Sequence, residues 1–471
     1  MDRLEIEKIV EEVLKRIKSP SETHKMPEGS GPLFDRMEDA ISASQKAQVY
    51  FQDQGVEKRK EIIEAIRKAA IENAEIFARE ALSETKMGRV EDKIQKNLLA
   101  AKKTPGVEDV EPCVFTGDAG MTLVEYGPFG VVGAIIPSTN PTSTVINNTI
   151  SILSGGNSVI FAPHPAAKRC SQLAIKILNE AILSAGGPPA LISAMKEPSI
   201  QGAEILFTDP RVKLLAVTGG PAVVKRAMKS EKRAICAGPG NPPVIVDESA
   251  EFPKCASDII SGASFDNGVL CTAEKEVIVC EKVWDKFLNA IRNDERAFEL
   301  TTSQMDELAK KAIKKPATPD EPEGVVNREF VGRNADYIAS QIGLTVKNSV
   351  RLLWGIVGIE HPYFWTEQLM PVLPVVKVPD IESAIELAVK VEGGNRHTAV
   401  MHSLNVKNLS KMARAFQGSI FVKNGPSYMG LGMGTGYATL TIATPTGEGL
   451  TKAKDFTREL RCALVDYFRI V

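Results

Sequence analysis

Cys271 is the residue whose surroundings in this sequence best suit a nucleophile. It follows the turn dipeptide Asn267-Gly268 and precedes the apolar run 275–280, which is typical of a β-strand. Nucleophiles are commonly presented on loops that rigid strands support. A thiolate at this point could add to a carbonyl carbon, and it would need a pKa lowered by backbone dipoles or a nearby base. A lone cysteine beside a strand is more often a buried, inert one.

The remaining reactive residue types argue against a metal centre and against several partners. The seven cysteines and five histidines are dispersed, with no CxxC pair or Cys/His cluster, so we expect reduced thiols and no metal site. A net charge of −2 gives no electrostatic case for nucleic acid or an acidic membrane. No apolar run reaches the roughly 18 residues of a membrane helix, and the N-terminus lacks the apolar core of a secretory signal. We therefore expect a cytoplasmic protein.

Most of the chain alternates between short β-rich runs and helical patterns. After a helical region that ends near residue 103, apolar runs followed by helices or glycine turns predict buried strands. These runs lie at 130–136, 158–163, 214–220, 243–247, 275–280 and 373–378. Such alternation favours an α/β fold with a mostly parallel, doubly wound sheet and ligands at the carboxyl ends of strands. A length of 471 residues predicts more than one domain.

The N-terminal region differs from the rest. Residues 1–18 predict an amphipathic helix, because apolar residues recur there at helical spacing, and residues 19–32 are rich in Pro, Ser and Gly and predict a flexible linker. The apolar stripe needs a surface to cover it. Either the helix folds back on its own body or oligomer, or it docks to a partner.

Six motifs in chain order resemble the aldehyde dehydrogenase superfamily, specifically its CoA-acylating branch. The resemblance is closest to the propionaldehyde dehydrogenases of propanediol-utilisation bacterial microcompartments, with the ethanolamine-pathway acetaldehyde enzymes close behind, and it covers residues 33 to 465. The motifs are GVVGAIIPSTNPTSTVINNTISILSGGNSVIFAPHP, AVTGG, GPGNPPVIVD, FDNGVLCTAEK, EQLMPVLPVVKV and FVKNGPSYMGLG.

The resemblance implies an aldehyde dehydrogenase-like fold and a domain order. We expect a Rossmann-type cofactor domain over 33–241, a catalytic α/β domain over 242–430, and a C-terminal return with an oligomerisation arm over 431–471. Part of the arm would come from 108–126. The family forms dimers or tetramers through such β-arms, and the β-rich tail 437–449 could form one.

The resemblance also implies a mechanism and its residues. Cys271 would form a thioacyl intermediate from a short aldehyde, and coenzyme A would take the acyl group in a reversible reaction. Either Thr139 or Asn140, together with the backbone N–H of Cys271, would hold the oxyanion, although both could simply cap a helix. His397 would assist thiol transfer, and a structural histidine is the alternative.

The sequence has no GxGxxG fingerprint of a dinucleotide-binding site. The expected cofactor residues are therefore those that the resemblance implies. NAD is the expected cofactor, with Glu367 at the nicotinamide ribose. Ala162 and His164 stand where hydrolytic relatives carry a ribose-binding lysine and glutamate, and His164 could equally be a plain surface residue. The residues expected near the cofactor are Pro137, Ser138, Ala162, His164, Thr218, Gly219, Gly220 and Glu367.

One departure from the hydrolytic relatives is informative. Their water-activating glutamate aligns with Cys236, and no carboxylate follows until Asp247. Without that base, water is a poor competitor for the acyl enzyme, which favours acyl-CoA as the product. The rivals are a hydrolytic dehydrogenase that releases free acid and a catalytically silent shell-interaction protein. Within this family, residues 1–18 would be an encapsulation tag that docks into a microcompartment shell.

Overall fold

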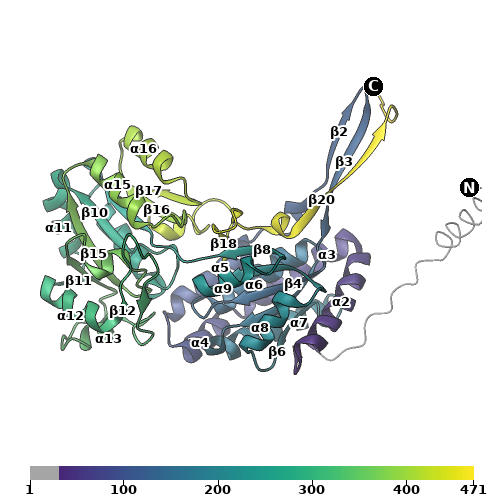
Figure 1. Ribbon diagram of the computed structural model, residues 1–471, viewed down its shortest axis with the longest axis horizontal. Coiled ribbons are helices and arrows are strands. Elements are labelled where there is room, and N and C mark those ends of the chain that lie inside the picture. Colours follow the sequence, from purple (N-terminus) through teal and green to yellow (C-terminus); the bar gives the residue numbers. More distant parts are fainter. Residues whose placement is uncertain (1–30) are drawn as a thin grey trace, which may run out of the picture.

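The computed structural model of the protein describes residues 31–471, and within that range two α/β bodies lie side by side with a β-ribbon arm projecting from the molecule (Figure 1). The first body holds a six-stranded parallel sheet in the order β1-β6-β5-β4-β7-β8. Its strands are β1 Leu33–Phe34, β4 Val131–Ile136, β5 Ser158–Pro163, β6 Ile192–Met195, β7 Val212–Thr218 and β8 Arg233–Ala237. The strand order reverses between β4 and β7, which confirms the doubly wound class and locates its switch point there.

Helices cover both faces of this sheet, so its strands are apolar on both sides. In β4, Val132 and Ala134 pack with one helical layer and Val131 packs with the other. The first layer contains α3 Gly55–Glu72, α4 Ala74–Thr85, α5 Val90–Lys103, α6 Pro141–Ser154 and α7 Lys168–Ser184. The second contains α2 Met37–Asp53, α8 Ile200–Thr208 and α9 Pro221–Met228.

The second body is built on a seven-stranded parallel sheet in the order β11-β14-β15-β10-β9-β16-β17. Its strands are β9 Pro243–Val246, β10 Glu276–Cys280, β11 Ala297–Leu300, β14 Leu352–Ile356, β15 Val372–Val378, β16 Thr398–His402 and β17 Ile420–Lys423. Its helices are α10 Lys254–Ser264, α11 Trp284–Arg292, α12 Thr302–Ala312, α13 Ala335–Ser340, α14 Pro362–Trp365, α15 Ile381–Val391 and α16 Val406–Phe416. A small hairpin joins β12 Ile313–Lys315 to β13 Val325–Val326.

The arm is an antiparallel three-stranded sheet of β2 Cys113–Gly117, β3 Gly120–Pro128 and β20 Thr457–Val465. The expectation that 437–449 forms an arm is wrong. That segment contributes only β18 Ile442–Ala443, which pairs with β19 Gly449–Leu450 beside the first body, because several of its residues are buried there. β20 takes the place in the arm instead.

The two sheets present opposite strand ends to each other. Residues that follow β4 and β7 in the first body face residues that precede β9, β10, β15 and β16 in the second. The predicted boundary between 241 and 242 falls in the short connection from β8 to β9, and the domain limits stay predictions. The proposed helix 1–18 and nearly all of the linker 19–32 lie outside the described residues. Across residues 31–471, no helix has the length and apolar character needed to cross a membrane.

Candidate active site

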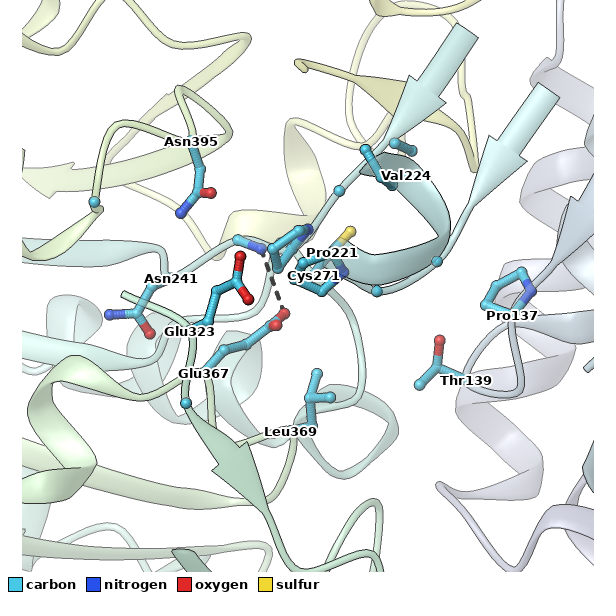
Figure 2. Close-up of a pocket in the computed structure, with 18 of the residues that line it drawn as sticks. Pro137, Thr139, Pro221, Val224, Asn241, Cys271, Glu323, Glu367, Leu369 and Asn395 are labelled. Atoms are coloured by element: carbon cyan, nitrogen blue, oxygen red, sulfur yellow. Dashed lines mark hydrogen bonds between the residues drawn. The ribbon is translucent and has the colours of Figure 1, made fainter. Parts of the chain in front are cut away.

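A cavity of about 1070 Å³ lies between the two bodies, and Cys271 is part of its wall. Four neighbouring strands of the second sheet contribute the loops that precede them, and these loops carry Asn241, Cys271, Glu367 and Asn395. Figure 2 shows Glu367 and Asn241 on one side of the cavity and Thr139 on the other, with Cys271 between them. The cavity is therefore formed jointly by both bodies.

The loop that presents Cys271 is held in an unusual backbone conformation. Asp266 and Asn267 in η3 (Phe265–Gly268) have φ angles of 47° and 55°, in the left-handed region where Asn and Asp are the best-tolerated residues after glycine. Asn267 Nδ2 donates to the carbonyl of Gly332 at 2.9 Å and to Asn334 Oδ1 at 2.8 Å. These bonds offset the backbone strain and fix the direction of the nucleophile loop.

Lys275 stabilises the same loop through hydrogen bonds to its backbone. Its buried ammonium donates to the carbonyl of Gly268 at 2.7 Å and to that of Leu270 at 3.3 Å. Burial lowers the pKa of Lys275, while the Glu367 carboxylate and the Cys271 thiol act in the opposite direction. The lysine therefore places a positive charge close to the nucleophile.

The expectation of a lowered thiol pKa is wrong. Burial raises the pKa of Cys271 to about 12, the Glu367 carboxylate raises it further, and Lys275 and Lys96 offset part of the rise. Desolvation dominates because the thiolate would lie in an apolar wall beside a carboxylate. The surroundings of Cys271 thus favour the thiol over the thiolate.

The turn after β4 brings both oxyanion candidates to the cavity. Pro137, Ser138, Thr139 and Asn140 all line it, and Asn140 is the N-cap residue of α6. Asn140 Nδ2 lies 3.3 Å from Thr139 Oγ1, and its Oδ1 accepts from the ammonium of Lys96 at 2.6 Å. Asn140 thus stands at the N-cap position, but its side chain makes no capping hydrogen bond and contacts Lys96 and Thr139 instead.

The cavity is also lined by most of the residues expected near the cofactor. Thr218, Gly219 and Gly220 end β7 and lead directly into α9, as predicted, and a Cβ on Gly220 would meet nothing within 4 Å. Glu367 accepts one long hydrogen bond, from the N–H of Gly240 at 3.4 Å, among the described residues. Burial raises the pKa of Glu367 to about 7. Its free oxygen positions suit hydroxyl donors such as those of a ribose.

His164 also lines the cavity, whereas Ala162 and His397 do not. Ala162 packs against the apolar cluster beneath α2, α8 and α9. The ring of His397 is fully buried behind Gly240, where an added Cβ would lie 3.0 Å from His397 Cγ and 2.7 Å from the carbonyl oxygen of Cys271. Burial lowers the pKa of His397 to about 4, so the ring is neutral at neutral pH.

Cys236 has no acid–base role in the geometry. It is buried in β8, its N–H donates to Thr446 Oγ1 at 3.0 Å, and burial raises its pKa to about 11. Its side chain packs in the apolar cluster rather than in the cavity wall. No carboxylate stands at the position where hydrolytic relatives are expected to carry their base.

Several cavity residues were missed by the reading of the sequence. They come from segments without a recognisable motif, and only tertiary packing brings them to the cavity. They are Lys225, Glu323, Arg328, Glu392 and Asn395, and Asn241 was also missed although it lies in the motif GPGNPPVIVD. Lys225 on α9 and Glu323 form an ion pair between the two bodies at the cavity mouth. Arg328 lies near His164, whose pKa is lowered by burial and by the Arg328 charge.

Comparisons with known proteins give the family. Residues 19–433 match the model of the aldehyde dehydrogenase family. The chain is 48% identical to an acetaldehyde dehydrogenase (acetylating) of Salmonella typhimurium over 100% of both chains. A propionaldehyde dehydrogenase from the Clostridium phytofermentans fucose utilisation bacterial microcompartment is similar in structure, with a TM-score of 0.89, 43% identity, and coverage of 94% of this chain and 100% of that one.

A second solved structure carries chemical information of its own. A Rhodopseudomonas palustris propionaldehyde dehydrogenase, solved with bound CoA and an acylated cysteine, has a TM-score of 0.89 and 42% identity, and the match covers 93% of this chain and 99% of that one. Identities of 42% to 48% over nearly the whole length of both chains show common family membership as well as a common fold. The chain belongs to the aldehyde dehydrogenase family.

Proposed function

We propose that this protein is an NAD-dependent, CoA-acylating aldehyde dehydrogenase that uses Cys271 as its nucleophile. It converts a short aldehyde, acetaldehyde or propionaldehyde, with CoA and NAD into acyl-CoA and NADH, and the reaction is reversible. The proposal is supported by the position of Cys271 in a cavity of dinucleotide size. It is also supported by relatives that are acetylating or that carry CoA and an acylated cysteine.

In the first half-reaction the Cys271 thiol releases its proton to solvent, and its sulfur adds to the aldehyde carbon. The developing oxyanion is held by the N–H of Cys271 and by Asn140 or Thr139. The positive charges of Lys275 and Lys96 favour the thiolate and partly offset its desolvation. Glu367 would hold the nicotinamide ribose of NAD, which when bound would supply the hydride acceptor, and the acyl group would remain on the Cys271 sulfur as a thioester.

In the second half-reaction the CoA thiol attacks this thioester, and Cys271 leaves as a thiolate. His397 is the proposed base for the CoA thiol because its ring is neutral at neutral pH and its Nε2 has no partner among the described residues. Since the ring lies behind Gly240, the proton would pass through one bridging water.

The presence of Cys236 in place of a glutamate favours acyl transfer to CoA over hydrolysis. With a buried thiol in place of a carboxylate, the acyl enzyme lacks the expected activator of water. Glu367 and Glu392 also line the cavity, and burial raises the pKa of each to about 7. A hydrolytic enzyme would have to recruit one of these two, and that is the alternative function to test.

The test follows NADH formation from purified protein with NAD and either aldehyde, with and without CoA. We expect one turnover without CoA, many turnovers with it, and neither in Cys271→Ala. Steady turnover without CoA would make the protein hydrolytic. Absence of NADH in every mixture would favour the silent shell-interaction protein.

We also propose that residues 1–18 dock to the shell of a bacterial microcompartment in the cytoplasm. Support comes from the amphipathic pattern and from the relative that belongs to a microcompartment. Fusing residues 1–32 to a fluorescent protein in cells that make shells should give puncta. Ile9→Asp with Val13→Asp should disperse them, and Lys8→Ala with Glu12→Ala on the polar face should not. Puncta that survive the apolar-face changes would reject the tag.

A further inference from the structure

Lys96 is a buried lysine in contact with both halves of the active site. It lies on α5, its side chain is 2% exposed, and its ammonium reaches Asn140 Oδ1 at 2.6 Å and the carboxylate of Asp266. Asn140 begins α6 in the first body, and Asp266 belongs to the nucleophile loop of the second. We propose that Lys96 is a positioning residue that fixes the amide of Asn140, so that its Nδ2 serves as the oxyanion donor. This inference rests on the proposed function.

The contact with Lys96 fixes the orientation of the Asn140 amide. An ammonium group can only donate, so its partner on Asn140 must be the carbonyl oxygen. With Oδ1 turned to α5, Nδ2 is directed to the side of Thr139 and the cavity that both residues line. A hydrogen bond from a charged donor also polarises the amide and strengthens Nδ2 as a donor. Lys96 therefore holds Asn140 with its amide nitrogen available as a donor, since one of the two Nδ2 hydrogens remains after the contact with Thr139 Oγ1.

Asp266 has other positively charged and N–H partners, so neutralising its carboxylate does not require Lys96. Lys93 already donates to the same Asp266 oxygen at 3.0 Å, and the N–H of Arg89 donates to the other oxygen at 2.8 Å. Burying a second ammonium at this carboxylate costs free energy, and burial is the first cause that lowers the pKa of Lys96, to about 8. The contact that distinguishes Lys96 from Lys93 is Asn140.

Lys96 lies close to the nucleophile but does not line the cavity. Lys96 is among the charges that lower the pKa of Cys271, so it lies within electrostatic reach of the thiol without lining the cavity. It cannot touch an aldehyde, and it acts through Asn140 and the local field. Its removal should slow the chemistry and leave the affinity for NAD nearly unchanged.

Lys93→Met provides a matched control for Lys96→Met. Both changes remove a buried ammonium from Asp266, and only the second frees Asn140. The readout is the rate of the single NADH turnover without CoA, which isolates thiol addition and hydride loss. We expect Lys96→Met to slow it about 100-fold, the range for loss of one oxyanion donor, with the KM for NAD within about twofold. Lys93→Met should slow it less than about fivefold.

A double-mutant cycle with Asn140→Ala tests whether Lys96 acts through the amide. In the Asn140→Ala background, Lys96→Met should cost much less than its own loss of about 100-fold, because only its charge effect on the Cys271 thiol is then removed, and fully multiplied losses would overturn the proposal. Equal losses in the Lys93 and Lys96 variants would overturn it as well. Should Lys96→Met fail to fold, Asn140→Asp keeps an acceptor for Lys96 and removes Nδ2. A fast turnover in that variant would also reject the role.

Failure of this inference can be told from failure of the proposed function. The first NADH turnover does not need CoA, so its rate would still show the effect of Lys96→Met if the enzyme were hydrolytic. Wild-type protein without any NADH turnover would overturn both. A normal wild-type turnover that Lys96→Met leaves unchanged would overturn the Lys96 role alone.

Discussion

Two opposing charges act on the thiol of Cys271: the Glu367 carboxylate raises its pKa, and the Lys275 ammonium lowers it. Glu367 has a pKa of about 7, so it is charged above that pH and then opposes formation of the thiolate. Replacing it with glutamine removes this opposition only above pH 7. The cofactor contact and the reactivity of the nucleophile are therefore coupled through one carboxyl group.

Glu367→Gln should accelerate alkylation of Cys271 by iodoacetamide at pH 8 to 9, by about tenfold for each unit by which the thiol pKa falls. Below pH 7 the wild-type and variant rates should converge, because Glu367 is then neutral. The same variant should raise the KM for NAD. Glu323→Gln removes another cavity carboxylate and is the control. Equal alkylation rates at high pH would show that Glu367 does not act on the thiol.

Arg328 gives a prediction about CoA. It is the one arginine among the described residues that line the cavity, and it lies close to His164 where the adenine ribose of a cofactor is expected. CoA carries a phosphate on this ribose that NAD lacks, and a guanidinium binds phosphate well. Arg328→Ala should raise the KM for CoA about tenfold and that for NAD less than twofold, with Lys390→Ala as the control. Equal increases for both would contradict it.

Residues within motifs could be predicted from the sequence, and residues that act across the interface could not. Cys271, Glu367 and Gly220 belong to contiguous motifs, so likeness located them. Lys96 gave no such signal, because it lies in a helix with an ordinary charged pattern and its importance comes from Asp266, 170 residues away. The thiol pKa was expected in the wrong direction because burial cannot be read from a turn and a strand.

At the scale of elements, Glu274 joins three segments around the nucleophile. It lies between Cys271 and β10, and its carboxyl accepts from the N–H of Ser427 at 2.8 Å and its Oγ at 2.7 Å, at the start of η5 (Ser427–Met429). A Cβ on Gly262 in α10 would come within 2.0 Å of Glu274 Oε1. Burial raises the pKa of Glu274 to about 7, above the 4.5 of an exposed glutamate.

This shift predicts a pH-dependent stability. Between pH 4.5 and 7 the folded state holds the proton on Glu274 and the unfolded state has lost it, so the contribution to stability falls as pH rises to 7. The total is on the order of 3 kcal/mol. Glu274→Gln should remove this term, so the variant should gain stability relative to wild type from pH 5 to 8 in urea unfolding. Parallel curves for the two proteins would contradict the assignment, and Ser427→Ala serves to separate loss of the hydrogen bonds from the charge.

The strands were the elements best predicted from the sequence. The run 158–163 coincides with β5, and the glycine pair after 154 coincides with the end of α6, because a strand buried on both faces and a glycine C-terminus leave strong local signals. The tail 437–449 was misread as an arm. Its alternating threonines and apolar residues satisfy a β pattern, yet Thr439 and Thr441 are buried in a side-chain network with Asn147 and Asn148.

At the scale of the whole molecule, the active site depends on two sheets whose opposite strand ends meet. The first sheet offers the carboxyl ends of β4 and β7, where helix N-termini begin, and the second offers the loops before its strands. Buried ion pairs between α5 and the nucleophile loop hold this arrangement. A sequence predicts each sheet separately, but the facing of the two sheets is decided by packing between distant segments.

The arm of β2, β3 and β20 projects from the two bodies, and we propose that it mediates a homo-oligomer. Its register places Val114, Leu123 and Leu464 on one face, and Val114 is 53% and Leu464 39% exposed. A three-stranded ribbon with an uncovered apolar face and two free edges is marginal alone. Leu464→Glu should therefore shift the mass measured by light scattering towards the monomer and lower the melting temperature. Thr122→Glu tests the opposite face, where Phe115 and Val465 are 60% and 62% exposed, and it should change the mass less. A monomeric wild type, or an equal or larger effect of Thr122→Glu, would refute the Leu464 face as the interface.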